Sequence, residues 1–422
     1  MDTERRFSPR AIVVGAGVVG LSIACGLQSR GLNTLLIDKF DAPQGASWGN
    51  AGHIATEQVE PLASPAALRS VTKRLFWRGG ALSLPLRYIA TWLPFSFRLV
   101  AASRHGKFAA GRAALSAPLG KAMASWRRLL ADAGAADLLR EEGHYVVWES
   151  PKTAAEGETR WRATDTGMAQ VLSVTRPELE ALQALTSVPL SGAIRFSGSG
   201  QIADTGELAE ALVRHFVENG GARRRATVTG IASENGVATL ALDDGSALSA
   251  GAIVVAAGAR SGALMQALGH VVPLIAERGY HIQSAETDWP ADMAPVVFED
   301  RSMIVTRFRS GLRAASIVEF GHADSPADPR KWARLRHHVA RLGLSFGLPG
   351  SEWMGARPTL PDYLPAIGRS RAAENIYYAF GHQHLGLTLA AVTGEAMVSL
   401  IAGEPLPFDI TPFDIERFGA VG

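Results

Sequence analysis

The sequence predicts an α/β protein with a Rossmann-like dinucleotide-binding domain that is discontinuous along the chain. Three stretches support this prediction, at residues 11–38, 252–259 and 376–394. The first reads as a strand, a glycine-rich turn, a helix and a second strand, and the second as a buried strand ending in small residues. The third reads as a strand, another glycine-rich turn and a helix. The segments between them differ in character and are expected to form a separate α+β domain.

The strongest signal is the glycine pattern near the N-terminus. The apolar run Ala11–Val14 precedes Gly15, Gly17 and Gly20, which have the spacing G-x-G-x-x-G. Glycines at this spacing allow a tight turn, a close approach of the backbone to a pyrophosphate, and close packing of a helix on a strand. The pattern therefore predicts a dinucleotide ligand.

The residues that follow the glycines complete this motif. A helix is expected over Val18–Ser29, and the free N–H groups at its N-terminus would face the phosphates. The apolar residues 35–37 read as a second strand, and Asp38 follows them. A carboxylate at this position accepts hydrogen bonds from ribose hydroxyls.

The composition is that of an ordinary globular protein. Its 422 residues are 47% hydrophobic and 19% charged, and the formal net charge is +2. The length indicates about two to three domains, and the weak charge argues against a nucleic-acid partner. The single cysteine, Cys25, excludes an internal disulfide and is expected to be a small buried residue of the first helix. The N-terminal residues lack an apolar secretory segment, so a cytoplasmic location is expected.

The longest lipophilic stretch covers residues 81–103. Prolines and arginines interrupt it, which makes it a poor candidate for a membrane span. Its aromatic residues alternate with arginines. Two interpretations remain open: a packing surface of the second domain, or a peripheral patch whose arginines meet anionic lipid.

The expected domain boundaries follow from these patterns. Segments 1–58, 200–270 and 350–422 are assigned to the cofactor domain, and segments 59–199 and 271–349 to the substrate domain. Within the cofactor domain, Asp204 is expected to cap a helix over residues 207–218. Asn235 and Gly236 are expected to form a hairpin turn.

The C-terminal glycine-rich turn distinguishes between two cofactors. Residues 381–386 lead into a helix expected to begin near Thr388. A second helix N-terminus aimed at the ligand stabilises the negative charge that a reduced flavin carries near N1 and C2=O. A nicotinamide enzyme does not need this element, so FAD is favoured over NAD.

Three sequence blocks resemble the FAD-dependent D-amino-acid oxidase superfamily, and within it the D-amino-acid dehydrogenases and glycine oxidases. They are GAGVVGLSIACGLQSRG with Asp38; WGNAGHI at 48–54; and WMGARPTLPDYLPAIG at 353–368 with GHQHLGLTLAAVTG at 381–394. The closing PLPFDITPFDIERF is most similar to bacterial dehydrogenases of hydroxy-D-proline. The resemblance covers nearly the whole chain, although residues 61–190 match only loosely.

The resemblance implies an activity. In this family a hydride passes from the substrate Cα to flavin N5, and the resulting imine hydrolyses to a keto acid. A cyclic amine would instead give a pyrroline carboxylate. The expected substrate is cis-4-hydroxy-D-proline or D-proline, and the electrons would go to a quinone or another acceptor. The alternatives are a glycine or sarcosine oxidase that releases peroxide, and a non-catalytic FAD-binding subunit.

The resemblance also implies roles for four side chains. Arg357, in the G-x-R-P motif, occupies the family's carboxylate-binding position, and its planar guanidinium suits bidentate pairing. Tyr280 matches a position where the family often places a tyrosine on the same carboxylate. His384 stands where glycine oxidases have a second arginine, which suggests a different partner such as a ring hydroxyl. His53 is expected to face the flavin or the substrate; a structural role is the alternative for both histidines. No metal site is predicted, because His382 and His384 lack a neighbouring carboxylate or thiolate in the sequence.

The residues expected to hold FAD come from the three blocks and from the strands between them. Cys25 is wrongly placed for the covalent tether that some relatives use, so noncovalent FAD is expected. The expected cofactor-binding residues are Gly15, Gly17, Val18, Val19, Gly20, Asp38, Lys39, Ser47, Asn50, Ala51, Gly52, Val228, Ala257, Gly258, Gly381, His382, Gly386, Leu387 and Thr388.

Overall fold

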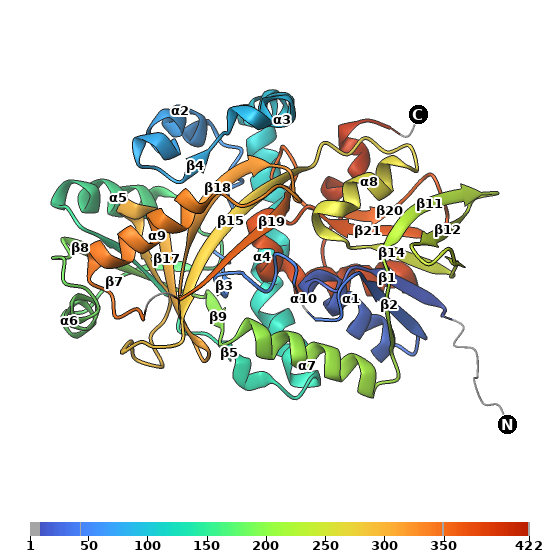
Figure 1. Ribbon diagram of the computed structural model, residues 1–422, viewed down its shortest axis with the longest axis horizontal. Helices are drawn as coiled ribbons and strands as arrows, with labels where there is room; N and C mark the ends of the chain where they lie inside the picture. The colour runs from blue at the N-terminus through green and yellow to red at the C-terminus, as the bar shows by residue number, and fades with distance from the viewer. Residues whose placement is uncertain (1–8, 43, 348–349, 421–422) are drawn as a thin grey trace.

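The computed structural model describes residues 9–42, 44–347 and 350–420. These residues form two large β-sheets, one toward each end of the long axis of the molecule (Figure 1). Helices cover both sheets. The α/β fold expected from the sequence is confirmed.

The first sheet has six strands among the described residues, in the order β10-β2-β1-β14-β21-β20. All neighbouring pairs are parallel except β20 and β21, which are antiparallel. The expected return of residues 252–255 beside the first strand is confirmed, since Ala11 pairs with Ala252. The strands are β1 (Ala11–Val14), β2 (Thr34–Asp38), β10 (Ala222–Arg225), β14 (Ala252–Val255), β20 (Ala366–Arg369) and β21 (Ile376–Phe380).

One face of this sheet packs against helix α1 (Val18–Ser29), which has the bounds the sequence predicts. Two neighbours of α1 are α7 (Thr205–Glu218) and α10 (Gly386–Ala402). Residues 383–402 are long and apolar enough to resemble a membrane span, but 67% of the most apolar window is buried inside the protein. Packing between α1, α4 (His105–Asp132) and the sheet explains the apolar character of α10.

The second sheet has nine strands among the described residues, in the order β19-β15-β18-β17-β16-β6-β8-β7, with β4 paired to β18. Helix α9 (Pro329–Leu342) packs against β15 and β18. The strands are β4 (Leu82–Ser83), β6 (His144–Trp148), β7 (Gln170–Ser173), β8 (Gly192–Ser197), β15 (Ile275–Ser284), β16 (Val296–Phe298), β17 (Met303–Phe308), β18 (Gly311–Gly321) and β19 (Ser351–Thr359).

Smaller elements complete the fold. A hairpin of β11 (Val228–Glu234) and β12 (Val237–Leu242) turns at Asn235 and Gly236, whose φ angles are 50° and 79°. This is the expected turn, and the expected cap is also present, because Asp204 accepts bonds from Gly206 N and Glu207 N. The other elements are β3 (His53–Ile54), β5 (Leu139–Arg140), β9 (Gly200–Ile202), β13 (Ala247–Leu248), α2 (Pro65–Arg74), α3 (Ile89–Ala102), α5 (Pro151–Ala163), α6 (Arg176–Ala184) and α8 (Ser261–Gln266).

Two elements belong to a different sheet or core from the one to which the domain boundaries drawn from sequence assign them. Strand β19 falls in the segment 350–422 assigned to the cofactor domain, but it is an edge strand of the nine-stranded sheet. Helix α4 falls in the segment 59–199 assigned to the substrate domain, but its Leu115 and Leu119 belong to the core around α1 and α10. Helical periodicity shows that a segment has an apolar face, but it does not show which sheet that face covers.

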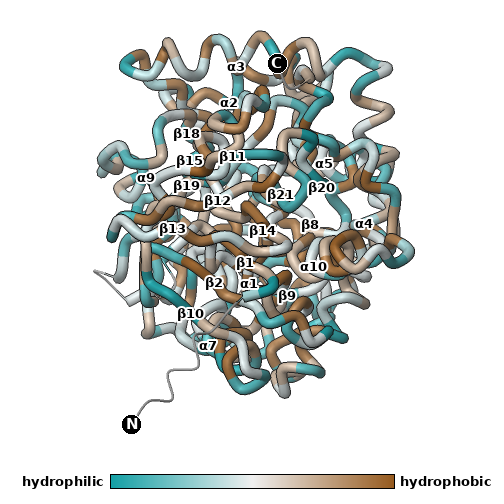
Figure 2. The backbone as a smooth tube through the Cα atoms, turned by 90° about the vertical axis from the view of Figure 1, so that its right-hand side faces the viewer, coloured by the Kyte–Doolittle hydropathy of each residue, from teal (hydrophilic) through white to brown (hydrophobic). Residues whose placement is uncertain are grey.

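Helix α3, from the lipophilic stretch 81–103, lies at the edge of the molecule (Figures 1 and 2). Its inner face packs through Phe95 against Phe320 of β18. Its outer face leaves Phe97 69% exposed, and the preceding turn leaves Leu86 78% exposed. The stretch is therefore partly a packing surface and partly an exposed apolar patch.

Candidate active site

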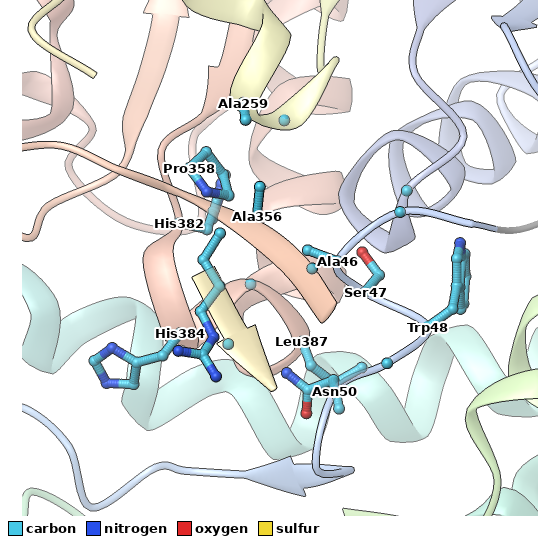
Figure 3. Close-up of a pocket in the computed structure, with 18 of the residues that line it drawn as sticks. Ala46, Ser47, Trp48, Asn50, Ala259, Ala356, Pro358, His382, His384 and Leu387 are labelled. Carbon is cyan, nitrogen blue, oxygen red and sulfur yellow. The ribbon is translucent and has the colours of Figure 1, made fainter. Parts of the chain in front are cut away.

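A cavity of about 1050 Å³ extends between the two sheets. Pockets for small ligands typically measure about 300–1,000 Å³, so this cavity suits a large ligand with a substrate beside it. Figure 3 shows part of it, with the loop carrying Ser47 and Asn50 on one side and Pro358 of β19 and His384 opposite.

The end of the cavity nearest α1 is built from backbone. Gly15 has a φ of +110°, and a Cβ there would lie 2.5 Å from Ala256 O. A Cβ on Gly20 would lie 1.9 Å from Gly15 O, so no larger residue fits at either position without backbone movement. This turn and the helix N-terminus behind it form the kind of cradle that binds a pyrophosphate.

Asp38 braces this turn and also borders the cavity. Its Oδ2 accepts a hydrogen bond from Ala16 N at 2.7 Å, and its Oδ1 accepts one from Phe40 N at 2.9 Å. Ser47 Oγ accepts a hydrogen bond from Val18 N at 3.1 Å. The side chain of Asp38 is therefore fixed in place at the end of β2, where a ribose hydroxyl would need its acceptor.

Most residues expected to hold the cofactor line this cavity. They are Gly15, Gly17, Val19, Asp38, Lys39, Ser47, Asn50, Ala51, Val228, Ala257, Gly258, His382, Gly386 and Leu387. The remaining five, Val18, Gly20, Gly52, Gly381 and Thr388, lie outside the lining and support it. Thr388 Oγ1, for example, accepts a hydrogen bond from Ala55 N at 2.9 Å and so ties α10 to the loop after β3.

The N-terminus of α10 enters the cavity at Gly386, two residues before the expected start. His382, four residues earlier, is buried, and burial lowers its pKa to about 3, so the ring is uncharged. Its Nε2 lies 3.1 Å from Thr393 Oγ1. An isolated bridge between Thr359 and His382 joins the end of β19 to this turn. Strand β19 and the α10 N-terminus therefore meet at one place.

Arg357 lies on β19, directly opposite Glu277 on β15. Its Nη1 donates to Glu277 Oε1 at 3.2 Å, and its guanidinium lies over Gly279, where a Cβ would be 2.3 Å from Nη2. Glu277 is 1% exposed and also accepts hydrogen bonds from Thr359 and Tyr363. A buried carboxylate thus orients Arg357, whose side chain is 26% exposed and borders the cavity.

Tyr280 also borders the cavity, but its hydroxyl points away from Arg357. Residues alternate along a strand, so Glu277 and Gly279 share the face of Arg357 while Arg278 and Tyr280 occupy the other. The Tyr280 hydroxyl donates to Glu319 Oε1 at 3.0 Å, and burial raises its pKa to about 12. The resemblance implies that this hydroxyl contacts the substrate carboxylate, and in the structure it bonds Glu319 on the opposite face of β15 from Arg357.

His53 lies beside two residues that sequence reasoning missed, Glu57 and His144. One ligand atom from each of the three lies within 4.8 Å of the others, and the rings of His53 and His144 are 4.3 Å apart. Burial alone would raise the pKa of Glu57, but both histidines outweigh it and lower that pKa to about 2. Burial and His53 lower the pKa of His144 to about 3. The cluster therefore combines a charged carboxylate with an uncharged His144.

His384 borders the same cavity. Its Nε2 contacts Gln58 Oε1, and burial lowers its pKa to about 4. The ring is therefore uncharged, unlike the arginine of glycine oxidases with which its position was compared.

The missed residues gave little local signal. Glu57 could have been noticed as a carboxylate four residues after His53, in a segment otherwise rich in apolar residues. Glu277 and His144 lie on strands far from the three sequence blocks. Only the pairing of β15 with β19, and the packing of His144 on His53, reveal their place in the site.

Comparisons with known proteins agree with this geometry. The family model described as "DAO: FAD dependent oxidoreductase" matches residues 10–400. A D-amino-acid oxidase of Bradyrhizobium diazoefficiens is 29% identical over 414 residues, covering 96% of this chain and 98% of the relative. A D-amino acid dehydrogenase of Cereibacter sphaeroides is 27% identical over 432 residues, covering 98% and 96%. The glycine oxidase structure from Geobacillus kaustophilus shares the fold, with a TM-score of 0.72 at 21% identity, covering 97% of this chain and 99% of that one.

Proposed function

Because the chain belongs to the DAO family of FAD-dependent oxidoreductases, we propose that it dehydrogenates a D-amino acid whose carboxylate binds Arg357. The observation that carries this proposal is the pairing of Arg357 with the buried Glu277 at the cavity wall. An arginine fixed by a buried partner keeps donors in a set direction for a planar carboxylate.

The residues at the other end of the cavity fit FAD. The turn at Gly15 and Gly20 would receive the pyrophosphate, Asp38 the ribose, and the N-terminus of α10 the flavin ring. When bound, FAD supplies the two-electron acceptor for the substrate Cα–H bond. The protein contributes orientation: Arg357 sets the substrate carboxylate on β19, next to the turn that leads into α10.

Within this class we propose a cyclic substrate, cis-4-hydroxy-D-proline or D-proline. The closing sequence PLPFDITPFDIERF supports this choice, because it resembles dehydrogenases of hydroxy-D-proline. A secondary ring amine that loses a hydride and a proton becomes a pyrroline carboxylate without release of ammonia. The cavity offers His53, Glu57 and His384 as polar partners for such a ring.

We also propose a quinone-type electron acceptor and a peripheral membrane contact through α3, on the cytoplasmic side. Support comes from the exposed Leu86 and Phe97 beside Arg87 and Arg98, because apolar and basic residues together favour the surface of an anionic bilayer. Vesicles containing phosphatidylglycerol should sediment the protein, and Phe97→Asp should weaken this binding. Sedimentation of the wild type and of Phe97→Asp to the same extent with the phosphatidylglycerol vesicles would contradict the proposal.

Turnover of a panel of D- and L-amino acids with an artificial dye acceptor tests the proposed function. D-proline and cis-4-hydroxy-D-proline should be oxidised, and their L-enantiomers should not. Peroxide released in air at the same rate as dye reduction would identify an oxidase of small amines instead. Absence of turnover with every amino acid would indicate a non-catalytic flavoprotein.

A further inference from the structure

Three buried polar atoms of residues that line the cavity lack a hydrogen-bond partner among the described residues. They are Nε2 of His53, Oε2 of Glu57 and Nδ1 of His384, and the first two lie 3.6 Å apart. The side chain of Glu57 is 1% exposed and that of His53 is 10% exposed. Buried polar groups are normally satisfied, and leaving them unpaired costs free energy. Both residues line the cavity that Arg357 also borders.

The chemistry of this pair restricts what could satisfy it. Glu57 is ionised, since its pKa is lowered to about 2, so its oxygen can only accept a hydrogen bond. An imidazole N–H at His53 Nε2 would donate one. A hydroxyl group does both: its oxygen accepts from the imidazole and its proton goes to the carboxylate. One oxygen at about 2.8 Å from each atom bridges a 3.6 Å gap.

The amine of the substrate fits this pair less well. A hydride leaves Cα only when the nitrogen lone pair is free, so the reacting amine must be uncharged. An ionised carboxylate beside the nitrogen stabilises the protonated form and therefore opposes the reaction. The pair is better suited to a neutral group elsewhere on the substrate.

The surroundings hold the pair in place. The ring of His144 packs on His53 at 4.3 Å and stacks on Phe196 at 4.5 Å, while its Nδ1 lies 3.0 Å from Ser199 Oγ. His384 was the residue expected from sequence to meet a ring hydroxyl. Its Nε2 contacts Gln58, while its buried Nδ1 also lacks a hydrogen-bond partner. Among the described residues that line the cavity, only His53 has its unpaired nitrogen 3.6 Å from an unpaired carboxylate oxygen.

We propose that His53 and Glu57 form a subsite that recognises a hydroxyl group on the substrate, and that this subsite makes the enzyme prefer hydroxylated D-amino acids. This inference rests on the proposed function. It assigns the preference for cis-4-hydroxy-D-proline over D-proline to two named side chains.

The test compares kcat/KM for cis-4-hydroxy-D-proline and D-proline in the wild-type holoenzyme and in two variants. His53→Phe keeps a flat ring against His144 but removes the donor, and Glu57→Gln keeps the shape but removes the charge. The ratio of the two kcat/KM values should favour the hydroxylated substrate in the wild type. It should fall by about tenfold or more in His53→Phe, because a site built to bond a hydroxyl discriminates through that bond.

Two controls separate specificity from general damage. Arg357→Lys should lower kcat/KM for both substrates and leave their ratio unchanged, because both carry the same carboxylate. His337→Asn, on the exposed face of α9, should change neither value. The flavin content of each variant reports whether it folds. If His53→Phe fails to fold, Glu57→Gln and the wild-type ratio still decide the question.

Three results would overturn the inference. Equal losses for both substrates in His53→Phe and Glu57→Gln would place the pair at the amine. A stoichiometric divalent metal in the wild type that is lost in these variants would identify a metal site of His53, Glu57 and His144. Equal kcat/KM values of the wild type for cis-4-hydroxy-D-proline and D-proline would show that the enzyme does not recognise the hydroxyl. Turnover of neither substrate, in contrast, would reject the proposed function itself.

Discussion

The two ends of the cavity are built in different ways. The end near α1 is built mainly from one continuous stretch, residues 11–38, with Gly15 and Gly20 at positions where a Cβ would collide with the main chain of Ala256 and of Gly15. The substrate end consists of side chains from separate strands, with Arg357 on β19, Glu277 on β15 and His53 on β3. The first end is local in sequence, whereas the second exists only after β15 has paired with β19 and the small sheet of β3, β9 and β5 has packed against the nine-stranded sheet.

This difference determines how each end responds to substitution. A backbone cradle depends on the absence of side chains, so adding atoms should destroy it. A side-chain site depends on charge and hydrogen bonding, so changes there should alter affinity or pH dependence while the fold persists. The four predictions below test this contrast, from the largest expected effect to the smallest.

Gly20→Val should abolish flavin binding. Its Cβ would lie 1.9 Å from Gly15 O, in the turn that carries the cradle, so the helix N-terminus must shift. Flavin absorbance per protein should fall more than tenfold, and the protein should become less stable. Gly106→Ala is the matched control, because no atom lies within 4 Å of its Cβ position and it should keep full flavin content. A yellow, fully loaded Gly20→Val protein would contradict the backbone description of this end.

Acid should destabilise the protein through buried histidines around the cavity. Burial lowers the pKa of His144, His281 and His382 to about 3. As the pH falls, these histidines take up protons at a higher pH in the unfolded chain than in the folded protein. Their contribution to the free energy of unfolding is therefore complete above pH 6.5 and is lost as the pH falls toward 3. Each should cost about 2 kcal/mol between pH 7 and pH 5.

Urea unfolding at pH 7, 6 and 5 with saturating FAD measures this loss. Replacing one histidine, as in His144→Gln, should make the dependence on pH shallower, whatever its effect on stability at pH 7. Glu57 should also lower the free energy of unfolding in acid, but at lower pH. Its pKa is depressed to about 2 in the folded protein, so its contribution to stability is lost as the pH falls below 4.5. A free energy of unfolding that stays constant from pH 7 to pH 5 would show that the histidines are not buried uncharged.

Arg357→Lys should raise KM for the amino acid at least tenfold, about 1.4 kcal/mol, with flavin content unchanged. A lysine keeps the charge beside Glu277 but loses the planar pair of donors. Steady-state kinetics with the dye acceptor give KM and kcat separately. An unchanged KM would place the substrate carboxylate elsewhere in the cavity.

Cys25→Ala should have the smallest effect. The Cys25 thiol is buried in α1, its Sγ lies 3.4 Å from Leu212 O, and burial raises its pKa to about 12. It should therefore resist alkylation in the native protein, and the variant should retain its flavin. Denaturation of the wild type should release all of the flavin. Flavin that stays attached to the denatured wild type but not to Cys25→Ala would show a covalent link and contradict the prediction.

The same contrast explains what could be predicted from the sequence. The strands and helix of residues 11–38 follow from local patterns, and so does the hairpin at Asn235 and Gly236, because the residues that make these features are neighbours in the chain. The roles of Tyr280 and Glu277 could not be predicted in this way. Side chains alternate between the two faces of β15, and Glu277, not Tyr280, lies on the same face as Arg357. Which residues of β15 share that face depends on the register in which β15 pairs with β19, and the local sequence does not reveal this register.

His53 shows the same limit. Its neighbour Glu57 is close in sequence, but His144 comes from β6 and reaches it only through the packing of the assembled sheets. The sequence could not show which sheet helix α4 covers, and in the structure its Leu115 and Leu119 lie in the core around α1 and α10.

The most direct measurement is the visible spectrum of the holoenzyme under nitrogen during addition of D-proline or cis-4-hydroxy-D-proline. The flavin absorbance should bleach with both substrates, at lower concentration with the hydroxylated one, and Arg357→Lys should need at least tenfold more of either. A flavin that stays oxidised at saturating concentrations of both compounds would contradict the assignment of this cavity to the oxidation of a cyclic D-amino acid.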